Sequence, residues 1–457
     1  MQNNSTPAST PDAPTFRALG VPEAVVRELD RQGLATAFPI QAATLPVTLA
    51  GGDVLGRGRT GSGKTLAFGI PTVAQIANSR SSRQPMRPRG LVLVPTRELA
   101  NQVLATIEPL AGALGLRATV VYGGVRQGAQ VAALRRGVDV LVATPGRLED
   151  LVSQGLCDLG AVEVTVLDEA DHMSDMGFLP AVKRLLDRTP KRGQRMLFSA
   201  TMDNDVDVLV RRYLTNPTTH SVDAAAAAPP KMSHHVVHVA ATDKGAIVRE
   251  LASGHGRAVL FTRTKHAAKK LARQLTAAGI PTVDLHGNLS QNARERNLAA
   301  FTSGEVRVLA ATDIAARGIH VDDIELVVHV DPPAEHKAYL HRSGRTARAG
   351  AAGAVVTLVT PEQKRDVAAL VRLAKISPTT LAVRAGSEEL RRLVGPEAPK
   401  VEARNLGGSG GGSAPAASRP GGGGRRTASA GSGRSRNQNR NGGRGRRSGR
   451  DRAAGAA

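Results

Sequence analysis

Short apolar runs that alternate with segments of helical composition constrain the fold of this chain more than any other feature. The runs are rich in β-branched residues and stay apolar through most of their length, which is typical of parallel strands that helices cover on both faces. In the first half of the chain they span residues 90–96, 119–124, 138–145, 164–171 and 195–201. The pattern predicts an α/β domain built on a parallel sheet.

The same alternation starts again in the second half of the chain. The sequence DAAAAAPPK follows Val222, and its small residues and two prolines are typical of a linker. Further apolar runs then cover residues 258–264, 282–287, 306–313, 326–333 and 354–360. We therefore expect two α/β domains joined by a short linker.

The composition changes abruptly at Asn405. Residues 405–457 contain 16 Gly and 11 Arg but a single acid, Asp451, and almost no large apolar side chains. Such a segment cannot bury enough apolar surface to offset the entropy of ordering it, so we expect a disordered basic tail. A solubilising linker is one interpretation. RNA binding is favoured, because Arg among Gly can follow a phosphate backbone and stack on bases.

The charge of the chain indicates a polyanionic partner. Lys plus Arg number 61 against 39 Asp plus Glu, which gives a net charge of +22. The single Cys157 excludes an intramolecular disulfide and a multi-cysteine zinc site. The N-terminus lacks a basic start and an apolar stretch, and no apolar run is long enough to span a membrane. We expect a cytoplasmic protein with no membrane partner.

Residues 58–65, GRTGSGKT, match the phosphate-binding pattern G-x-x-x-x-G-K-[ST]. They follow the short apolar stretch at 53–55 and lead into a segment of helical character, which is the strand, loop and helix context that the pattern requires. Backbone N–H groups would surround the phosphates, the lysine would supply positive charge, and the threonine would bind Mg²⁺. The residues that we expect to contact the nucleotide here are Gly61, Ser62, Gly63, Lys64 and Thr65.

An acidic sequence, Asp168-Glu169-Ala-Asp171, ends a later apolar run. It would lie at the carboxyl end of a buried strand, where open α/β sheets bind ligands. In a P-loop enzyme Asp168 would hold Mg²⁺ together with Thr65, and Glu169 would orient and deprotonate the attacking water. An acidic turn that merely ends a strand is the alternative. The complementary chemistry of the two sequences favours a nucleotide site.

With GSGKT at 61–65 and DEAD at 168–171, the chain resembles the DEAD-box ATP-dependent RNA helicases of superfamily 2, from about Phe16 to about Pro361. The resemblance implies two tandem RecA-like P-loop domains that bind ATP, Mg²⁺ and the backbone of RNA. The expected parts are a disordered N-terminus at 1–14, a first domain at 15–222, a linker at 223–232, a second domain at 233–385, a C-terminal extension at 386–404 and the disordered basic tail at 405–457.

Several further motifs resemble those with which this family contacts RNA. Threonine hydroxyls, backbone groups and arginines at strand ends suit a sugar-phosphate chain rather than base edges. By resemblance, the RNA-binding residues are Thr96, Arg97, Gly124, Thr144 and Arg147 in the first domain, and Arg263 and Thr312 in the second. Gln291 with Arg294 resembles another second-domain motif. Ser199-Ala-Thr201 resembles the motif that couples hydrolysis to domain closure, so Ser199 and Thr201 are expected to act in that coupling.

Arg345 and Arg348 lie three residues apart, which would point both guanidiniums the same way from a turn or helix start. Such a pair suits contact with the γ-phosphate from the second domain, so that ATP bridges the two domains. A solvated arginine pair is the alternative, and the two nucleotide motifs earlier in the chain argue against it. By resemblance, His341 would help to position the water and Asp313 would meet the ribose.

Residues 33–41 resemble the adenine-sensing segment of the family, with Phe16 as its distant aromatic residue. The carboxamide of Gln41 can pair with a ring acceptor and an amino donor of adenine at once, which implies selectivity for ATP over GTP. Weaker base stacking and a softer ATP preference are expected from the departures in this segment. In this segment the departures from the family pattern are Leu34 for an aromatic and Ala37-Phe38 for Pro-Thr. Elsewhere His320 replaces Asp and Ala347 replaces Gly, and neither departure touches the charges that the chemistry requires.

These motifs predict an RNA-dependent ATPase whose domains close over ATP and single-stranded RNA and thereby unwind short duplexes or remodel RNA–protein complexes. A related superfamily 2 enzyme that acts on duplex DNA is one rival. An RNA chaperone or clamp whose tail performs the annealing is another. Bacterial members of the family serve ribosome assembly and RNA turnover, so ribosomal and RNA-decay assemblies are candidate partners.

Other chemically distinctive residues are expected to be structural. Met173 and Met176, which follow the acidic sequence, are more typical of packing than of a ligand site. His234, His235 and His238 are close in sequence, but no cysteine or carboxylate cluster accompanies them and strand alternation would send neighbours to opposite faces. We expect no transition metal there.

Overall fold

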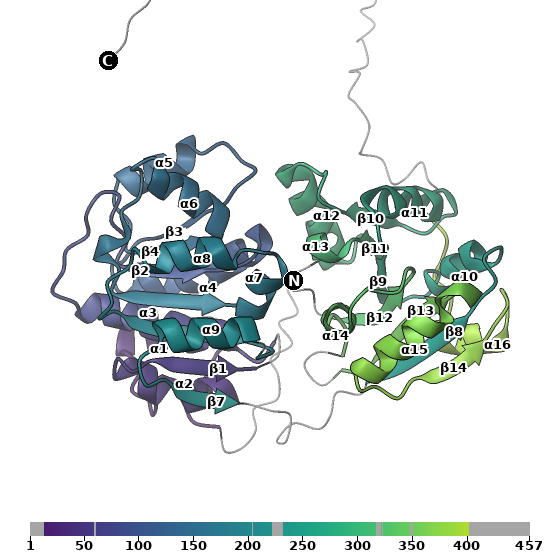
Figure 1. Cartoon of the computed structure of the whole chain (residues 1–457), viewed down its shortest axis with the longest axis horizontal. Helices are drawn as coiled ribbons and strands as arrows, with labels where there is room; N and C mark the ends of the chain where they lie inside the picture. The colour runs from purple at the N-terminus through teal and green to yellow at the C-terminus, as the bar shows by residue number, and fades with distance from the viewer. Residues whose placement is uncertain are drawn as a thin grey trace, which may run out of the picture. The chain divides into compact units, whose positions relative to one another are not determined.

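The computed structural model describes residues 13–58, 61–202, 204–221, 232–316, 321, 323–347 and 351–401. Most of the predicted linker and all of the predicted basic tail lie outside these residues, as does Arg348. The described part contains two seven-stranded sheets, and every strand pair in both of them is parallel (Figure 1). The expected fold class, tandem α/β domains with parallel sheets, is confirmed.

The first sheet has the strand order β3-β4-β2-β5-β6-β1-β7. Its interior strands β2, β4, β5 and β6 are buried along their whole length, which explains their continuous apolar sequence. The strands are β1 (Val54–Arg57), β2 (Gly90–Leu93), β3 (Ala118–Val121), β4 (Val140–Ala143), β5 (Val164–Asp168), β6 (Gln194–Ser199) and β7 (Thr218–Ser221).

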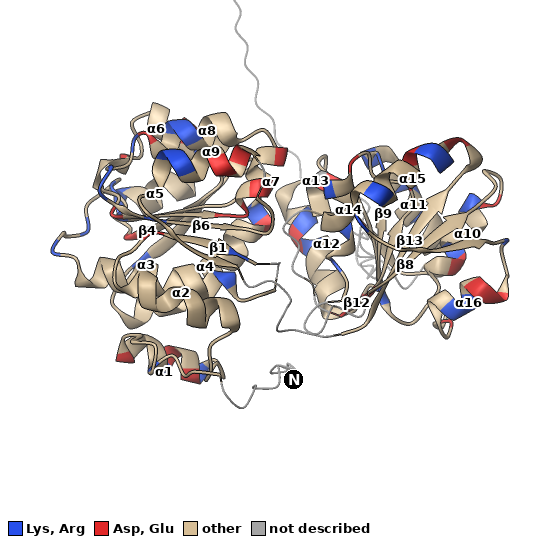
Figure 2. Ribbon diagram, turned by 60° about the horizontal axis from the view of Figure 1, so that its bottom comes forward, with Lys and Arg blue, Asp and Glu red and all other residues tan. Residues whose placement is uncertain are grey.

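Helices cover both faces of the first sheet (Figure 2). Side chains of α1 to α4 form one core cluster with the sheet, and those of α5 to α9 form the other. The helices are α1 (Glu23–Arg31), α2 (Pro39–Leu49), α3 (Lys64–Asn78), α4 (Arg97–Ala113), α5 (Gly128–Arg135), α6 (Pro145–Ser153), the 3₁₀ turn η1 (Leu159–Ala161), α7 (Ala170–Asp175), α8 (Leu179–Leu186) and α9 (Asn204–Tyr213).

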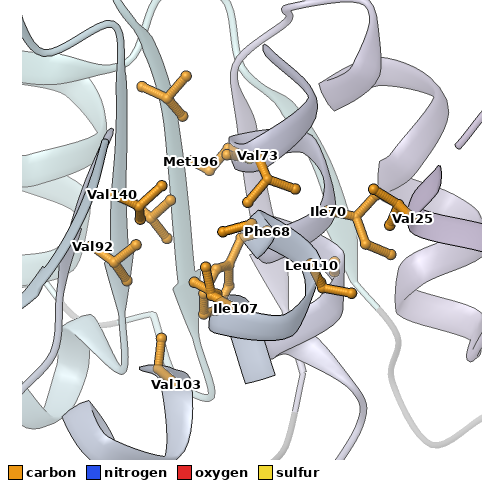
Figure 3. Close-up of a cluster of buried hydrophobic side chains, with 14 of the residues drawn as sticks. Val25, Phe68, Ile70, Val73, Val92, Val103, Ile107, Leu110, Val140 and Met196 are labelled. Atoms are coloured by element: carbon orange, nitrogen blue, oxygen red, sulfur yellow. The ribbon is translucent and has the colours of Figure 1, made fainter. Parts of the chain in front are cut away.

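Phe68 on α3 lies in the middle of the first of these clusters (Figure 3). Its ring is fully buried and packs against the ring of Phe198 on β6, with the centroids 5.4 Å apart. Val92 from the sheet and Ile107 from α4 belong to the same cluster. The helix that begins at the phosphate-binding loop is therefore fixed against the sheet along its apolar side, which positions its N-terminus.

The second sheet has the order β10-β11-β9-β12-β13-β8-β14. The same arrangement of buried central strands recurs, with helices α10, α11 and α16 packed on one face and α12 to α15 on the other. The strands are β8 (Met232–His238), β9 (Arg257–Phe261), β10 (Thr282–Leu285), β11 (Val308–Ala311), β12 (Ile324–His329), β13 (Gly353–Val359) and β14 (Thr379–Ala382). The helices are α10 (Lys244–Leu251), α11 (Lys265–Ala277), α12 (Gln291–Ser303), α13 (Asp313–Ala316), α14 (His336–Ser343), η2 (Pro361–Gln363), α15 (Lys364–Leu373) and α16 (Glu388–Val394).

The segment expected as a C-terminal extension, 386–404, packs against the second domain as far as it is described. Leu390 on α16 is fully buried in the same cluster as Ile247 of α10. The N–H of Val401 donates a 2.9 Å hydrogen bond to the carbonyl of Gly279. The extension thus contributes to the core of the second domain.

The topology divides one edge of the first sheet into two halves. Because all its strands are parallel, their carboxyl ends meet at the same edge. The phosphate-binding loop follows β1, DEAD includes the end of β5, and Ser199 ends β6, so these three motifs lie on one half of the edge. The expected RNA motifs follow β2, β3 and β4, which are neighbours on the other half.

Candidate functional site

The phosphate-binding loop leads directly into the N-terminus of α3. Gly61 and Gly63 both have φ of +87°, a left-handed conformation that L side chains rarely adopt, so glycine is required at these two turns. The hydroxyl of Ser62 is buried without a hydrogen-bond partner among the described residues. An unsatisfied donor beside a helix N-terminus is a suitable environment for a phosphate oxygen.

Lys64, the first residue of α3, is almost completely buried and has two partners. Its Nζ lies 2.8 Å from Oε1 of Glu169 and donates a 3.0 Å hydrogen bond to the carbonyl of Gly58. Burial alone would lower the pKa of Lys64, but the negative charges of Glu169 and Asp168 raise it. The ammonium is thus charged and lies beside the loop, where it can pair with phosphate.

Asp168 ends β5 with one carboxylate oxygen unsatisfied. Its Oδ1 is buried and has no hydrogen-bond partner among the described residues. Burial raises the pKa of Asp168 to about 7, although Lys64 favours the charged form. A divalent cation would supply the missing partner, so Asp168 and Thr65 fit the expected Mg²⁺ site.

Glu169 is the first residue after β5 and has an unusual backbone conformation. Its φ of +55° places it in the left-handed region, which costs a non-glycine residue about 1–2 kcal/mol. Burial would raise its pKa, but Lys64 and the neighbouring His172 hold the carboxyl well below its usual range. The Nδ1 of His172 lies 2.9 Å from Oε2 of Glu169. Sequence reasoning did not single out His172, whose role depends on its place one helical turn after Glu169.

The last acid of the DEAD sequence contacts the Ser199-Ala-Thr201 motif. Both the N–H and the hydroxyl of Thr201 donate to Oδ2 of Asp171, at 3.0 and 2.8 Å. Ser199 is fully buried, and its hydroxyl donates to the carbonyl of Thr201 at 2.8 Å. A shift of the DEAD segment would therefore be transmitted to the end of β6 through hydrogen bonds. The expected coupling role of Ser199 and Thr201 stays a prediction.

The expected adenine-sensing residues, Gln41 and Phe16, are buried and have partners within the first domain. Gln41 is fully buried, its Oε1 accepts from the N–H of Phe38 at 2.8 Å, and its Nε2 donates to the carbonyl of Gly63 at 2.9 Å. Phe16 is 2% exposed and belongs to the core of the first domain. Gln41 thus joins the N-terminus of α2 to the phosphate-binding loop, and adenine contacts of Gln41 and Phe16 stay predictions.

Arg97 and Gly124 are adjacent at the other half of the sheet edge. Thr96 caps α4 by accepting a 3.2 Å hydrogen bond from the N–H of Leu99. Gly124 has φ of +79°, and a Cβ atom there would overlap the guanidinium of Arg97. Burial lowers the pKa of Arg97, and its Nη1 donates to Oε1 of Gln291 in the second domain at 3.2 Å.

Thr144 and Arg147 bring the ends of β3 and β4 together. Thr144 precedes α6 as its N-cap and is almost completely buried. The guanidinium of Arg147 donates to Oε1 of Gln130 at 3.2 Å and to the carbonyl of Val125 at 3.1 Å. The structure thus places the five first-domain RNA candidates at the ends of three neighbouring strands, β2, β3 and β4.

The second-domain candidates follow the ends of β9 and β11, which are also neighbours. Arg263 has an exposed side chain, and its backbone N–H donates to Oδ2 of Asp331 at 2.9 Å. Thr312 follows β11 directly. Asp313 forms a two-point ion pair with Arg342, whose guanidinium also donates to the carbonyl of Asp331 at 2.8 Å.

Arg342 was not singled out from the sequence. Its guanidinium is also positioned 5.1 Å above the centroid of the Phe261 ring. It is almost completely buried and joins α14 to the ends of β9, β11 and β12. Because Asp313 is engaged by Arg342, the predicted ribose contact would require this carboxylate to serve both partners. Only its contacts in the folded structure identify Arg342, since no spacing pattern in the sequence distinguishes it from the other arginines nearby.

His341 lies in the last turn of α14, and Arg345 lies just after the end of this helix. Arg345 is 5% exposed, lies in the turn after the helix rather than at a helix start, and donates from Nε to the carbonyl of His341 at 3.2 Å. Burial, and next the neighbouring His172, lower the pKa of His341 to about 3. The rings of His341 and His172 lie 4.2 Å apart between centroids. A small pocket in the second domain is lined by Phe261, Asp313, Ala316, Ala338, His341, Arg342 and Arg345.

Of the three histidines near the start of the second domain, two have separate side-chain partners, while Nδ1 of His238 is buried without a hydrogen-bond partner among the described residues. Nδ1 of His234 lies 2.9 Å from the hydroxyl of Tyr339, and Nε2 of His235 lies 3.0 Å from the hydroxyl of Ser233.

Met173 is fully buried in the core, as a packing residue would be. In the part of the chain that the structure describes, no helix is both long and apolar enough to cross a bilayer.

Comparison with protein families gives two matches that together include most of the expected site. Residues 38–209 match the family described as DEAD/DEAH box helicase, and residues 243–350 match the helicase conserved C-terminal domain. The chain is 44% identical over 364 residues to DEAD-box ATP-dependent RNA helicase 3A, chloroplastic, of Zea mays, an alignment that covers 78% of this chain and 48% of the relative. The chain thus spans about half the length of that relative.

A bacterial relative matches over nearly its whole length. The chain is 36% identical over 404 residues to ATP-dependent RNA helicase RhlB of Vibrio parahaemolyticus, which covers 86% of this chain and 92% of the relative. Among solved structures, Saccharomyces cerevisiae Dbp5 bound to RNA and ADP BeF3 superposes with a TM-score of 0.71 at 26% identity, covering 80% of this chain and 95% of that one. The likeness thus extends across both sheets.

Proposed function

Because this chain belongs to the DEAD-box family of ATP-dependent RNA helicases, we propose that it hydrolyses ATP in response to single-stranded RNA. One observation carries the proposal: the strand order places the phosphate-binding motifs and the candidate RNA motifs on adjacent halves of one sheet edge. A single domain then offers an ATP surface and an RNA surface that share the central strands. The RNA-bound and nucleotide-analogue-bound Dbp5 structure supports the same pairing of ligands.

The residues of the first domain have distinct roles in the proposed reaction. Lys64 and the N–H groups at the start of α3 would hold the phosphates. Mg²⁺, when bound, would neutralise charge on them, and Thr65 with Asp168 are the residues that would hold it. Glu169, which Lys64 and His172 keep ionised, would accept a proton from the attacking water. Its carboxylate must first separate from Lys64, which then pairs with phosphate.

The second domain would complete the site when the two domains close. Arg345 is held by α14, and Arg342 fixes that helix to the sheet through Asp313 and the carbonyl of Asp331. In the closed state Arg345, with Arg348, would approach the γ-phosphate and stabilise charge in the transition state. Hydrolysis would then depend on whatever brings the domains together.

RNA would be that ligand. The candidate RNA residues present threonines, backbone groups and guanidiniums rather than side chains suited to base edges, so binding would be independent of sequence. A strand held by both domains would shift the equilibrium towards the closed state by its differential affinity for it. We propose that a strand bound in this way is removed from a duplex, so that short helices are separated locally.

Steady-state ATPase measurements test this function directly. The proposal expects a low rate for the protein alone, a rise of at least tenfold with single-stranded RNA, and little rise with DNA of the same length and sequence. A rate that is the same with and without RNA would overturn it. Equal stimulation by duplex DNA would favour the rival in which a related enzyme acts on DNA.

A further inference from the structure

The amino ends of the first-domain strands form a second edge, at the opposite end of the sheet from the candidate site. Four loops meet there because the strands they precede are parallel: residues 79–89 before β2, 114–117 before β3, 136–139 before β4 and 187–193 before β6. In Figure 2 the loops at the left of the first domain carry blue segments, away from α7 and the DEAD sequence. The phosphate-binding loop, the DEAD sequence and the candidate RNA motifs do not lie on this edge.

These loops are rich in cations that have no counter-ion. The basic edge, as we define it, consists of seven exposed side chains that make no ion pair or side-chain hydrogen bond with any residue that the structure describes. Its members are Arg80, Arg117, Arg136, Arg188, Lys191 and Arg192 in the loops, and Arg135 at the end of α5. Most other exposed arginines of this domain do have acidic partners, as in the pairs Arg17–Glu23 and Arg212–Asp187.

Three acids of this edge have arginine partners. Asp139 is fully buried and binds two arginines, Arg83 and Arg89. Asp158 pairs with Arg87 at 2.9 Å, and Asp187 with Arg212. A further acid is Glu163, directly before β5, which accepts a hydrogen bond from the hydroxyl of Ser81. The seven cations of the basic edge outnumber it, so the field at this edge is positive.

Hydrogen bonds to the buried Asp139 hold the loops of the basic edge in place. Asp139 accepts hydrogen bonds from Nε of Arg83 at 2.6 Å, from Nη2 of Arg89 at 2.5 Å and from the backbone N–H of Arg117 at 2.8 Å. The N–H of Met86 donates to the carbonyl of Leu134 at 2.8 Å. Three of the four loops are thus fastened to one another, so the guanidiniums extend from a fixed base rather than from free chain.

We propose that the basic edge is a second binding site for the sugar-phosphate backbone of RNA. From β3 to β6 the edge spans four strand spacings, or about 19 Å, which is wide enough for several successive phosphates. The four loops contain no aromatic residue on which a base would stack, so the site contacts backbone and does not distinguish sequences. The proposal rests on RNA being the substrate of the site at the opposite edge.

This second site distinguishes long RNA from short RNA. A strand just long enough for the candidate RNA motifs cannot also reach the opposite edge of the sheet, whereas a longer RNA can occupy both edges at once. Two linked contacts raise the effective concentration of each, so long RNA binds more tightly than the motifs alone allow. Substrates with single-stranded or duplex flanks are therefore favoured over isolated short strands.

The test compares short and long RNA in one triple variant of the full chain. In R80Q/R117Q/R136Q three cations of the basic edge are neutralised. The matched control, K269Q/K270Q/R273Q, removes three exposed cations from α11, and R80K/R117K/R136K keeps the charge. Each protein is assayed for RNA-stimulated ATPase with strands of about ten and about fifty nucleotides, and for equilibrium binding of the longer strand at several salt concentrations. All variants keep the basic tail, so its contribution is common to them.

We expect the KM for the long strand to rise about tenfold in the Arg→Gln triple, and the slope of log affinity against log salt to fall by about 2, near 0.7 for each lost phosphate contact. The KM and kcat with the short strand should not change, and the Arg→Lys triple should behave as the unmodified protein. Unchanged KM and salt slope with the long strand would overturn the inference and leave the edge to another kind of partner. Failure of the short strand to stimulate the unmodified protein would instead refute the proposed function, while the binding measurements still test the edge.

Discussion

Lys64 and Glu169, 105 residues apart in sequence, form a 2.8 Å ion pair in which each side chain is only 6% exposed. The lysine of the phosphate-binding loop and the proposed base therefore satisfy each other in this structure. In the proposed function, a phosphate that paired with Lys64 would replace the Glu169 carboxylate as its partner. ATP binding would then free the proposed base.

The first prediction concerns Glu169→Gln, which keeps the shape of the side chain and removes its charge. We expect kcat of the RNA-stimulated ATPase to fall by about 10²–10⁴, because proton transfer by a placed side chain contributes about that factor. ATP and RNA should stay bound together, which a gel-shift or fluorescence assay would detect.

The control for this variant is Glu149→Gln, which neutralises an acid in a surface ion pair with Arg184 and should leave kcat unchanged. Turnover at the normal rate in Glu169→Gln would exclude it as the base. Lys64 loses its buried partner in Glu169→Gln. Adding ATP should therefore raise the thermal unfolding temperature of this variant more than that of the unmodified protein.

The second prediction compares neighbouring glycines. Gly124→Ala places a Cβ against the guanidinium of Arg97 and forces a side chain into the left-handed region, whereas Gly123→Ala meets no atom within 4 Å. We expect Gly124→Ala to raise the KM for RNA at least fivefold by displacing Arg97, with Gly123→Ala close to the unmodified protein. Equal KM values for the two variants would show that Arg97 does not need this close approach.

Much of the fold could be predicted because its strands are buried on both faces. Each predicted run overlaps an observed strand and extends past the strand's end, as in 90–96 against Gly90–Leu93. The extra residues leave the sheet to form the site. The edge strands β7 and β14 were not predicted, since their sequences, Thr-Thr-His-Ser and Thr-Thr-Leu-Ala, are mostly exposed and carry no apolar run.

The candidate site was predictable where its signal is local. Lys64 and Asp168 belong to short sequence motifs whose residue types alone indicate phosphate and cation binding. The structure brings the two residues together at the sheet edge. His172 and Arg342 were missed because their contacts, with Glu169 and with Asp313, depend on packing that no spacing reveals. The internal hydrogen bonds of Gln41 could not be foreseen for the same reason.

The third prediction concerns Ala347, where the family pattern has glycine. Its φ of +54° lies in the left-handed region, which a Cβ atom disfavours by about 1 kcal/mol. Ala347→Gly should therefore raise the free energy of unfolding by about 0.5–1 kcal/mol, measured by urea denaturation. Ala338→Gly, inside α14, should lower it by about 1 kcal/mol through lost helix propensity. A loss of stability in both variants would contradict the conformation of the turn that precedes Arg348.

The fourth prediction concerns Asp139, whose carboxylate fastens the loops of the basic edge. Burial would raise its pKa, but the hydrogen bonds from the Arg117 N–H, Arg89 and Arg83 outweigh it and lower the pKa below the ordinary 3.8. Asp139→Asn leaves Arg89 buried without its counter-ion, so the free energy of unfolding should fall by about 3–5 kcal/mol at pH 7. Asp158→Asn, which removes the partner of the half-exposed Arg87, should change it by less than about 1 kcal/mol.

The pH dependence of the Asp139→Asn effect has a definite sign. A carboxyl whose pKa is depressed on folding contributes stability that is fully present above its unfolded pKa and is lost as pH falls through its folded pKa. The difference between the unmodified protein and Asp139→Asn should therefore be constant from pH 7 down to about pH 5 and shrink below the ordinary value of 3.8. Urea denaturation at several pH values measures it. A difference that grew on acidification would mean that Asp139 is neutral in the folded protein, and that the arginines of this edge are held by something other than its charge.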